Sequence, residues 1–236
     1  MKYNSIVILT GAGISAESGI NTFRASDGLW ENHPIEKVAT PEGFRKDPKL
    51  VHQFYNERRN QLLNPAISPN AAHLALAKLE KDYLGNVWVV TQNIDNLHER
   101  AGSKNLIHMH GEILKIRCKK SGQIYSCHEP ISNNDNCSCC ELTGTLRPHI
   151  VWFGEMPFFM DEIYQHLDQA SIFVSIGTSG NVYPAAGFVE HARESGARCI
   201  EINPQPTYNP NFDDFRQGVA SIEVPKLVSQ IIEKKL

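Results

Sequence analysis

The sequence predicts an α/β protein with a doubly wound, parallel sheet and an inserted subdomain. Three observations support this fold class. A glycine-rich loop follows a strand-sized apolar run near the N-terminus, strand-like and helical segments alternate after residue 85, and five of the six cysteines lie between Cys118 and Cys140. Alternating strands and helices are typical of parallel sheets covered by helices on both faces. A chain of 236 residues can bury a full core of this kind.

The domain organisation follows from where this alternation is interrupted. We expect the large domain to comprise residues 1–30, 85–115 and 147–236. We expect a helical insertion over residues 31–84 and a cysteine-rich, zinc-binding insertion over residues 116–146. The whole chain then forms one functional unit.

The glycine-rich loop lies in SIVILTGAGISAESGINTFR, residues 5–24. Gly11, Gly13 and Ala16 match the G-x-G-x-x-G/A pattern directly after a predicted strand. Glycine suits this position because a Cβ would block the turn or the approach of a ligand. The pattern predicts that backbone N–H groups and a helix N-terminus face a pyrophosphate. A tight turn that binds nothing is the alternative.

This loop differs from a dehydrogenase fingerprint in what comes next. A dinucleotide-binding unit continues within ~30 residues into a second strand that ends in Asp or Glu. Here the chain runs instead into NTFRASDGLWENHP, residues 21–34, which is polar and turn-rich. We therefore predict an insertion that opens the first unit beside the phosphate site.

Residues 34–84 are predicted to be helical. Val51, Tyr55, Arg58 and Leu62 recur at intervals of four, three and four, which places them on one stripe of a helix. Arg58 therefore stands where an apolar residue is expected. Either its stem covers the core while its head stays in water, or Tyr55 and Arg58 together offer a hydroxyl and a guanidinium to a carboxylate.

The sheet resumes with NVWVVT at residues 86–91, and further strands and helices follow in alternation. We predict strands near 106–109, 171–176, 198–202 and 221–224, and helices near 157–170, 182–195 and 225–234. Ligands of such sheets bind outside the carboxyl ends of the strands. Those ends read TGAG, TQNID, HMHG, GTSG and EINP, which favours one large cofactor site.

Polar side chains are concentrated at two of these strand ends. Gln92, Asn93 and Asp95 leave one strand together and can supply two amides and a carboxylate, although Asn or Asp here could equally cap the following helix. His110 directly precedes a glycine and is placed to take a proton. His108, on the same face of its strand, is predicted to be a structural histidine.

The cysteine-rich insertion predicts a metal site. Cys137-x-x-Cys140 is half of a tetrahedral zinc site, because two intervening residues let one turn present both sulfurs. The other half departs from the pattern, since Ser121 stands three residues after Cys118. The fourth ligand is then Cys127, Cys139 or none, and a metal-free remnant is the alternative to zinc.

The segment RPHIVWFGE, residues 147–155, is predicted to be extended. At a sheet edge it could accept a peptide as an additional strand. The alternative is an internal strand buried on both faces.

Composition limits the cellular context. The formal net charge of −3 leaves no dominant basic field, so we expect no direct binding of duplex nucleic acid. The apolar runs are only strand-sized, so we expect no membrane helix or signal peptide. We therefore expect a cytoplasmic, monomeric protein with reduced thiols, where clustered cysteines bind metal more often than they form disulfides.

Taken together, GAGISAESGINTFR, TQNIDNLHERAG, HMHG, the cysteine module, PHIVWFGE, GTSG and EINP resemble the sirtuin family of NAD-dependent protein lysine deacylases. The resemblance spans nearly the whole chain. It implies a Rossmann-like large domain and a smaller domain formed by a helical insertion and a cysteine-rich, zinc-binding insertion. It also implies a cleft between them where NAD meets an acyl-lysine peptide. The Tyr55-x-x-Arg58 pair is similar to that of class III members, which accept succinyl and malonyl groups, and of bacterial members that retain deacetylase activity.

The resemblance also implies roles for individual residues. His110 corresponds to the catalytic base, and Cys118, Cys137 and Cys140 correspond to zinc ligands. The segment Val151, Trp152, Phe153, Gly154 and Glu155 corresponds to the strand that pairs with the substrate peptide. The NAD-binding positions are Gly11, Ala12, Gly13, Ala16, Phe23, Arg24, Gln92, Asn93, Ile94, Asp95, Gly177, Thr178, Ser179, Asn203 and Ala220. Residues 21–30 would be a mobile lid over NAD.

In the implied mechanism nicotinamide leaves NAD, the acyl oxygen captures the ribose carbon, and His110 takes a ribose hydroxyl proton. The products are free lysine, nicotinamide and O-acyl-ADP-ribose. Three alternatives remain open at this point: an NAD-dependent oxidoreductase, a protein ADP-ribosyltransferase, and a non-catalytic NAD-sensing module. The missing acidic strand end disfavours the first of these.

Overall fold

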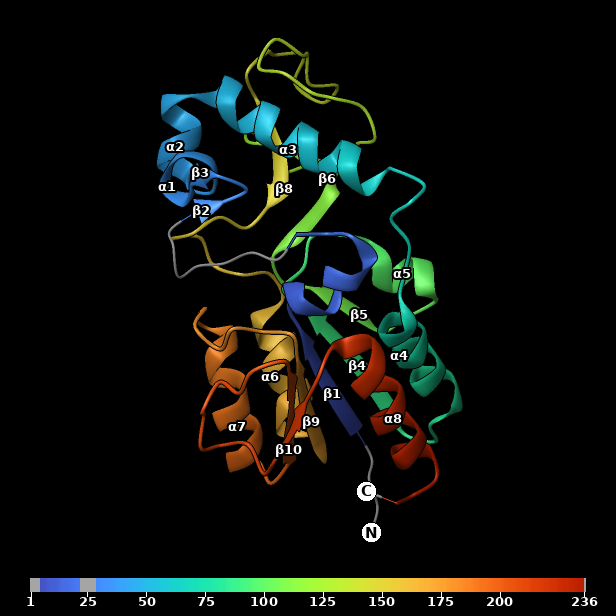
Figure 1. Ribbon diagram of the computed structural model, residues 1–236. Coiled ribbons are helices and arrows are strands. Elements are labelled where there is room, and N and C mark those ends of the chain that lie inside the picture. Colours follow the sequence, from blue (N-terminus) through green and yellow to red (C-terminus); the bar gives the residue numbers. More distant parts are fainter. Residues whose placement is uncertain (1–4, 22–28, 236) are drawn as a thin grey trace.

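The computed structural model describes residues 5–21 and 29–235 of the chain. Phe23, Arg24 and most of the predicted lid lie outside these described residues. The molecule has a large domain built on one parallel sheet and a small domain stacked on the carboxyl ends of its strands (Figure 1). The predicted fold class, a Rossmann-like parallel sheet with a smaller second domain, is confirmed.

The large domain contains a six-stranded parallel sheet in the order β11-β10-β9-β1-β4-β5. Its strands are β1 (Ser5–Thr10), β4 (Asn86–Thr91), β5 (Leu106–His108), β9 (Ile172–Ile176), β10 (Arg198–Asn203) and β11 (Asp214–Gln217). Strand β1 pairs with β4 on one side and with β9 on the other. The chain therefore reverses its direction of winding beside β1, and the crevice at such a point is where open α/β sheets bind ligands.

Helices cover both faces of this sheet. Alternate side chains of β1 enter two different cores: Ile6 and Ile8 join the cluster with α4 (Ala71–Asp82) and α8 (Ala220–Ile232). Val7 and Leu9 join the cluster on the opposite face. That second face is covered by α6 (Met160–Asp168) and α7 (Phe188–Glu194), as Figure 1 shows. Burial on both faces explains why β1 is a continuous apolar run.

The small domain combines the first part of the helical segment with the cysteine-rich segment, whereas α4 at the end of the helical segment packs on the large sheet. The helical part comprises α1 (Ile35–Val38), α2 (Pro41–Lys46), α3 (Pro48–Leu62) and the hairpin β2 (Leu29–Trp30) with β3 (His33–Pro34). The other part is an antiparallel sheet in the order β7-β6-β8, formed by β6 (Gly111–Cys118), β7 (Ile124–Ser126) and β8 (Leu146–Ile150). The predicted helical segment is confirmed, and Asp47 starts α3 by accepting a hydrogen bond from the Leu50 N–H at 2.9 Å.

A buried arginine joins the two parts of the small domain. Arg59 of α3 is fully buried, and its Nε donates to the Ile113 carbonyl at 3.1 Å. Its Nη1 donates to the Asn56 side chain at 2.7 Å and to the Glu129 carbonyl at 3.4 Å. The sequence did not predict this contact, because Arg59 lies outside the helical stripe that contains Arg58.

Two predicted elements are wrong. Residues 221–224 belong to α8 rather than to a strand, and the last strand is β11 instead. The buried residues Ala220, Val224, Leu227 and Val228 have helical spacing, and Pro225 lies inside the helix rather than at its start. The glycine loop is followed by two short 3-10 turns, Ala12–Ile14 and Ala16–Ser18, so the predicted helix N-terminus is absent from this part of the described chain.

In the part of the chain that the structure describes, no helix combines the length and apolar character needed to span a membrane.

Candidate active site

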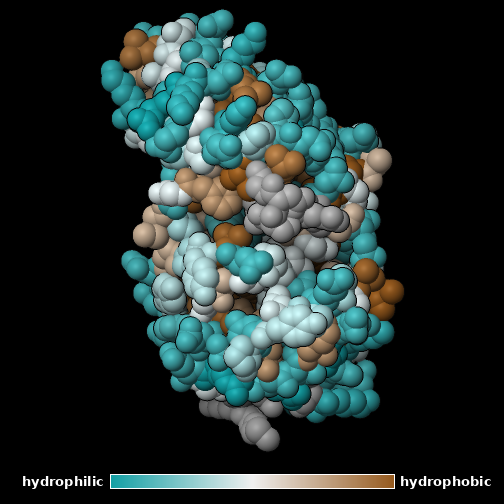
Figure 2. All heavy atoms as spheres, turned by 60° about the vertical axis from the view of Figure 1, so that its left-hand side comes forward, coloured by the Kyte–Doolittle hydropathy of each residue, from teal (hydrophilic) through white to brown (hydrophobic). Residues whose placement is uncertain are grey.

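A cavity of about 680 Å³ lies where the carboxyl ends of the parallel strands meet the small domain. In Figure 2 apolar side chains gather at this waist between the two domains. Most of the predicted site residues line the cavity: Gly11, Ala12, Gly13, Tyr55, Arg58, Gln92, Asn93, Ile94, Asp95, His110, Val151, Trp152, Phe153, Gly154, Glu155, Gly177, Thr178, Ser179 and Asn203. Its size is typical of small-molecule and cofactor sites.

Two predicted cofactor positions lie elsewhere. Ala16 is exposed and does not contribute to the cavity wall, while Ala220, the first residue of α8, is buried in the core. The sequence missed several residues that do line the cavity, including Ser15 within the glycine loop and Thr207 after β10. Ser15 could have been found from its place in GAGIS, whereas Thr207 has no local signal.

The glycines of the loop serve close packing more than the donation of free N–H groups. Gly11 N donates to the Ile176 carbonyl at 3.0 Å, and Gly13 N donates to the Gly177 carbonyl at 2.9 Å. A Cβ on Gly13 would lie 2.6 Å from Gly177 Cα. Gly177 itself has φ of +61°, which an L side chain rarely adopts. The two loops can therefore approach each other only because both carry glycine.

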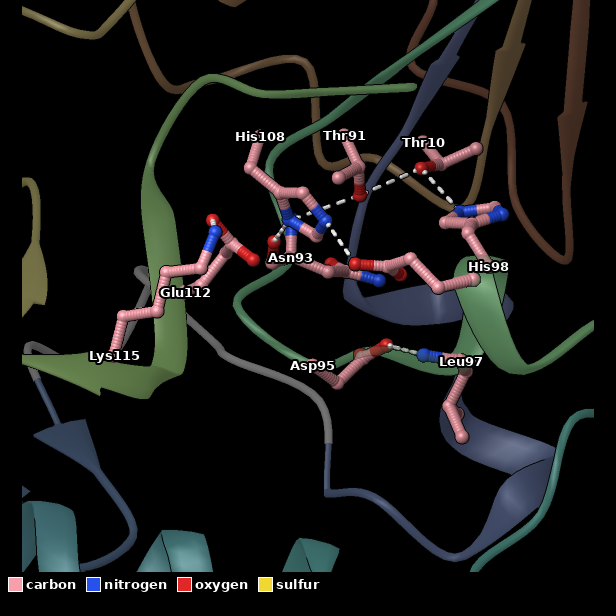
Figure 3. A network of polar contacts seen from close by, with 10 residues as sticks. Thr10, Thr91, Asn93, Asp95, Leu97, His98, His108, Glu112 and Lys115 are labelled. Carbon is pink, nitrogen blue, oxygen red and sulfur yellow. Dashed lines mark hydrogen bonds and ion pairs between the residues drawn. The ribbon is translucent and has the colours of Figure 1, made fainter. Parts of the chain in front are cut away.

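Asn93 is held from several sides (Figure 3). Its backbone N–H donates to Thr91 Oγ1 at 3.1 Å. Its side-chain Nδ2 donates to the Gly11 carbonyl at 3.1 Å and to Ser15 Oγ at 3.2 Å. The amide therefore connects β4 to the glycine loop and faces the cavity in one orientation.

Asp95 has two functions in the structure. One carboxylate oxygen accepts from the Leu97 N–H at 3.0 Å in the turn that leads into α5 (Leu97–Ala101), whose N-cap residue, Asn96, makes no side-chain capping bond. The other oxygen accepts from Ser15 Oγ at 2.9 Å. Burial raises the pKa of Asp95, although these two hydrogen bonds oppose the shift.

His110 lies beyond the end of β5 and lines the cavity. Its Nδ1 is 3.1 Å from the Gln92 carbonyl, which can only accept, so Nδ1 carries a proton and Nε2 of the neutral ring carries the lone pair. Burial lowers the pKa of His110, which keeps the ring neutral to lower pH. A neutral imidazole with a free lone pair in a cavity is suited to act as a base.

Tyr55 and Arg58 reach the same cavity from α3. Tyr55 is fully buried, and its hydroxyl oxygen accepts from Trp152 Nε1 at 2.9 Å. The Arg58 guanidinium lies 3.8 Å from the centre of the Phe54 ring. Its Nη2 is 3.9 Å from the Glu31 carboxylate and its Nη1 is 3.0 Å from that of Glu57. The head of Arg58 is therefore mostly shielded from water, unlike that of an arginine that only covers the core with its stem.

The segment 151–155 is not the extended strand that the sequence predicted. Strand β8 ends at Ile150, and the following residues form a turn. The Val151 N–H donates to the His110 carbonyl and the Phe153 N–H to the Ala39 carbonyl, both at 2.9 Å. Glu155 pairs with Arg147 at 2.6 Å. These contacts bend the segment along the cavity wall.

The cysteine-rich module brings four thiols together. The Sγ atoms of Cys118, Cys137, Cys139 and Cys140 all lie within 4.8 Å of one another. Tetrahedral zinc with Zn–S bonds of about 2.3 Å places sulfurs about 3.8 Å apart, so these four residues fit the ion. Cys127 Sγ instead donates to the Glu129 carbonyl at 3.2 Å. The structure thus groups Cys139, rather than Cys127, with the three predicted ligands.

Comparison with known proteins agrees with this geometry. Residues 11–184 match the model of the Sir2 family. A protein of Vibrio cholerae described as an NAD-dependent protein deacylase is 63% identical over 233 residues, covering 98% of this chain and 95% of the relative.

Solved structures are also similar. A Sir2 homologue in complex with NAD has a TM-score of 0.88 at 38% identity, covering 98% of this chain and 91% of that one. A mutant Sir2 homologue in complex with 2'-O-acetyl ADP ribose has a TM-score of 0.87 at 37% identity, covering 98% and 93%. The chain belongs to the Sir2 family, the sirtuins.

Proposed function

We propose that this protein is an NAD-dependent protein-lysine deacylase that removes acetyl, succinyl and malonyl groups. One observation carries the proposal: His110 stands where the strand-end loops and the Tyr55 and Arg58 side chains meet in a single cavity. The descriptions of the V. cholerae relative and of the two Sir2 complexes agree with this activity.

NAD fits the cavity as a consumed co-substrate. The cavity opens at the point where the sheet reverses its winding, and its far end contains a buried Thr207 hydroxyl without a partner among the described residues. Gly177, Thr178, Ser179 and Asn203 would hold the adenosine part of NAD. Gln92, Asn93, Ile94 and Asp95 would surround the nicotinamide and its ribose.

Different residues of the chain would have different roles in the reaction. NAD supplies the ribose carbon that receives the acyl oxygen as nicotinamide leaves. His110 Nε2 would take a proton from a ribose hydroxyl, and its Nδ1–H, held by the Gln92 carbonyl, keeps the ring in the required tautomer. The segment 151–155 would hold the substrate backbone beside the cavity.

The acyl pocket would recognise a terminal carboxylate. Tyr55, Arg58 and Glu31 all line the cavity, and the Glu31 carboxylate stands next to the Arg58 guanidinium. An anionic acyl group would compete with Glu31 for the guanidinium. A neutral acetyl group would leave that ion pair in place, so both kinds of substrate can be accommodated.

Zinc would bind Cys118, Cys137, Cys139 and Cys140 as a structural ion. Tetrahedral coordination by four thiolates closes the site and holds the ends of a module that has little apolar core of its own. We further propose that the protein acts as a monomer in the cytoplasm on acyl-lysine proteins. All six cysteines are free thiols, which agrees with a reducing compartment.

Nicotinamide release from NAD in the presence of acetyl-, succinyl- and malonyl-lysine versions of one peptide tests the proposal. His110→Ala and His110→Tyr should lower turnover ~10²- to 10⁴-fold, because a general base is lost. His191→Ala, at a partly exposed position that does not line the cavity, is the matched control and should keep full activity.

The same samples separate the competing functions. Formation of NADH without nicotinamide release would indicate an oxidoreductase. Labelled ADP-ribose on a protein acceptor would indicate a transferase of that kind. Binding of NAD without nicotinamide release from any acyl peptide would indicate a sensing module, and near-normal turnover by His110→Ala would refute the role of His110.

A further inference from the structure

A cluster of titratable side chains touches the wall of the NAD cavity from outside. It consists of Glu99 on α5, His108 at the end of β5 and Glu112 on β6, whose polar atoms lie within 4.8 Å of one another. His108 is 8% exposed, so it is almost fully enclosed, whereas Glu99 reaches the surface. Figure 3 shows the ring of His108 beside Asn93. Neither His108 nor Glu99 lines the cavity itself.

The contacts of His108 define its protonation. Its Nε2 lies 2.8 Å from Glu99 Oε1 and its Nδ1 lies 3.3 Å from the Asn93 carbonyl. A carboxylate and a carbonyl oxygen can only accept, so both ring nitrogens must donate. Only the imidazolium form does this. In the neutral ring, one nitrogen would turn a lone pair towards one of the two oxygens.

The surrounding charges favour the imidazolium. Burial lowers the pKa of His108, but the hydrogen bond and the charge of Glu99 raise it, and the carboxylate of Glu112 adds to this, so that the net shift is upward. Lys115 on β6 is paired with Glu112 at 2.5 Å, which weakens the effect of that carboxylate. His98 on α5 and Asp95 are the other titratable groups that face this region.

His108 completes the set of contacts that hold Asn93. The backbone N–H and the side-chain Nδ2 of Asn93 are already bound to Thr91, Gly11 and Ser15, and His108 holds the remaining backbone carbonyl. Asn93 would contact the nicotinamide end of NAD. Rotation of the peptide unit after Asn93 would also displace Ile94, another residue of the cavity wall.

We propose that the His108–Glu99 pair is a positioning device for Asn93, in which the imidazolium fixes the Asn93 carbonyl and loss of its proton at alkaline pH weakens NAD binding. The pair acts through Asn93 and does not touch the co-substrate. The inference rests on the proposed function only in taking NAD as the occupant of the cavity.

The titrations of His110 and His108 then set the acid and the alkaline limits of the pH range in which the enzyme is active. Burial lowers the pKa of His110, so the base remains neutral and active below the usual histidine range. His108 must stay protonated, and its raised pKa extends NAD binding upward. A bell-shaped profile with the acid limb from His110 and the alkaline limb from His108 follows.

The decisive variant is Glu99→Gln. The glutamine keeps an oxygen that can accept a hydrogen bond from His108, but it lacks the charge that raises the pKa of His108. Because the side chain at position 99 is partly exposed, we expect the variant to fold. Removing one adjacent opposite charge should move the alkaline limb of NAD affinity, measured by calorimetry from pH 6.5 to 9.5, downward by ~1 pH unit. At the acid end of this range the affinity of the variant should approach that of the wild type, since a larger fraction of the molecules carries protonated His108 there.

Two further variants separate positioning from general destabilisation. Glu112→Gln removes the same charge from a carboxylate that is bound to Lys115 instead of His108. It should shift the alkaline limb of NAD affinity by less than half of the shift in Glu99→Gln. His108→Gln should bind NAD more weakly at every pH and lose the alkaline limb. An unchanged limb in Glu99→Gln, or a limb that survives in His108→Gln, would overturn the proposal.

The measurement of NAD binding keeps this inference separate from the proposed activity. If NAD binds with the expected pH dependence but no acyl peptide yields nicotinamide, the proposed function fails and the positioning role stands. If turnover is normal and the NAD affinity of Glu99→Gln follows the wild-type profile, the positioning role fails alone.

Discussion

The indole N–H of Trp152 donates a hydrogen bond to the hydroxyl oxygen of Tyr55 at 2.9 Å, although the two residues are 97 positions apart in the chain. Indole nitrogen can only donate, so the tyrosine must accept there. Its own O–H is then directed to another acceptor. Because Tyr55 also lines the cavity, we propose that its hydroxyl contacts the acyl group of a substrate.

Replacing Tyr55 by phenylalanine should affect both stability and selectivity. Loss of the acceptor leaves the buried Trp152 N–H unpaired, which should lower the free energy of unfolding by ~1 to 3 kcal/mol. Loss of the hydroxyl donor should reduce kcat/KM for a succinyl peptide ~10-fold more than for an acetyl peptide. Urea unfolding and the two peptide assays measure these effects, and an equal fall for both peptides would limit Tyr55 to a structural role.

Replacing Arg58 by methionine should change the selectivity between acyl groups more than replacing Tyr55 by phenylalanine does. A charge-assisted contact with a carboxylate contributes ~1.5 to 3 kcal/mol, so desuccinylation should fall ~10- to 100-fold more than deacetylation. Arg45→Met on the neighbouring helix α2 removes the same charge from an exposed position and serves as the control. Equal losses of desuccinylation and deacetylation in Arg58→Met would show that Arg58 has a structural role and does not contact the acyl carboxylate.

Glu31 should restrain the use of anionic substrates. Its carboxylate is 3.9 Å from Arg58 on the cavity wall. Glu31→Gln should therefore raise kcat/KM for the succinyl peptide ~3- to 10-fold, with little change for the acetyl peptide, as expected for one partly screened charge. Glu57→Gln neutralises a carboxylate that is closer to Arg58 but lies outside the cavity, and a gain of equal size there would contradict this interpretation.

Zinc content should depend on Cys139 and not on Cys127. Cys139→Ser removes one of the four clustered thiols, so the purified protein should retain well under one zinc ion per chain and should unfold more readily. Cys127→Ser changes a thiol bound to a backbone carbonyl and should keep one ion. Metal analysis by mass spectrometry provides the comparison. One zinc ion per chain in Cys139→Ser would show that Cys139 is not the fourth ligand, which would leave Cys127 or none.

Acid should destabilise the fold through buried histidines. Burial lowers the pKa of His73 to about 4, whereas the unfolded chain keeps the usual value of about 6.5. The contribution of neutral His73 to stability is therefore complete above pH 6.5 and is lost as the pH falls towards 4. The loss should approach about 3 kcal/mol at lower pH.

His73→Gln tests this pH dependence. The difference between its free energy of unfolding and that of the wild type should narrow as the pH falls from 7 to 4.5. His128→Gln, at an exposed position, is the control for the substitution itself. A difference that is constant over this range would show that His73 does not titrate on unfolding.

Much of the site could be predicted because parallel strands bring their carboxyl ends to one edge of the sheet. TGAG, TQNID, HMHG and GTSG are far apart in the sequence, yet each directly follows a strand, so the periodicity of the strands was enough to predict that they converge. His110 was found for the same reason. Errors occurred where local signals compete, as in α8, whose apolar residues also fit a short strand and whose proline suggested a later start.

The sequence by itself determined the parallel sheet, the helical insertion, the cysteine module and the loops that form the cavity, since each depends on periodicity or on spacing within a few residues. Only the tertiary structure decided that Cys139 joins the other three thiols, that Trp152 orients Tyr55, and that His108 connects Glu99 to Asn93. These relationships depend on how separate segments pack and on which buried polar atom reaches which partner. Local patterns do not encode that pairing, because it is settled only when both segments leave water together.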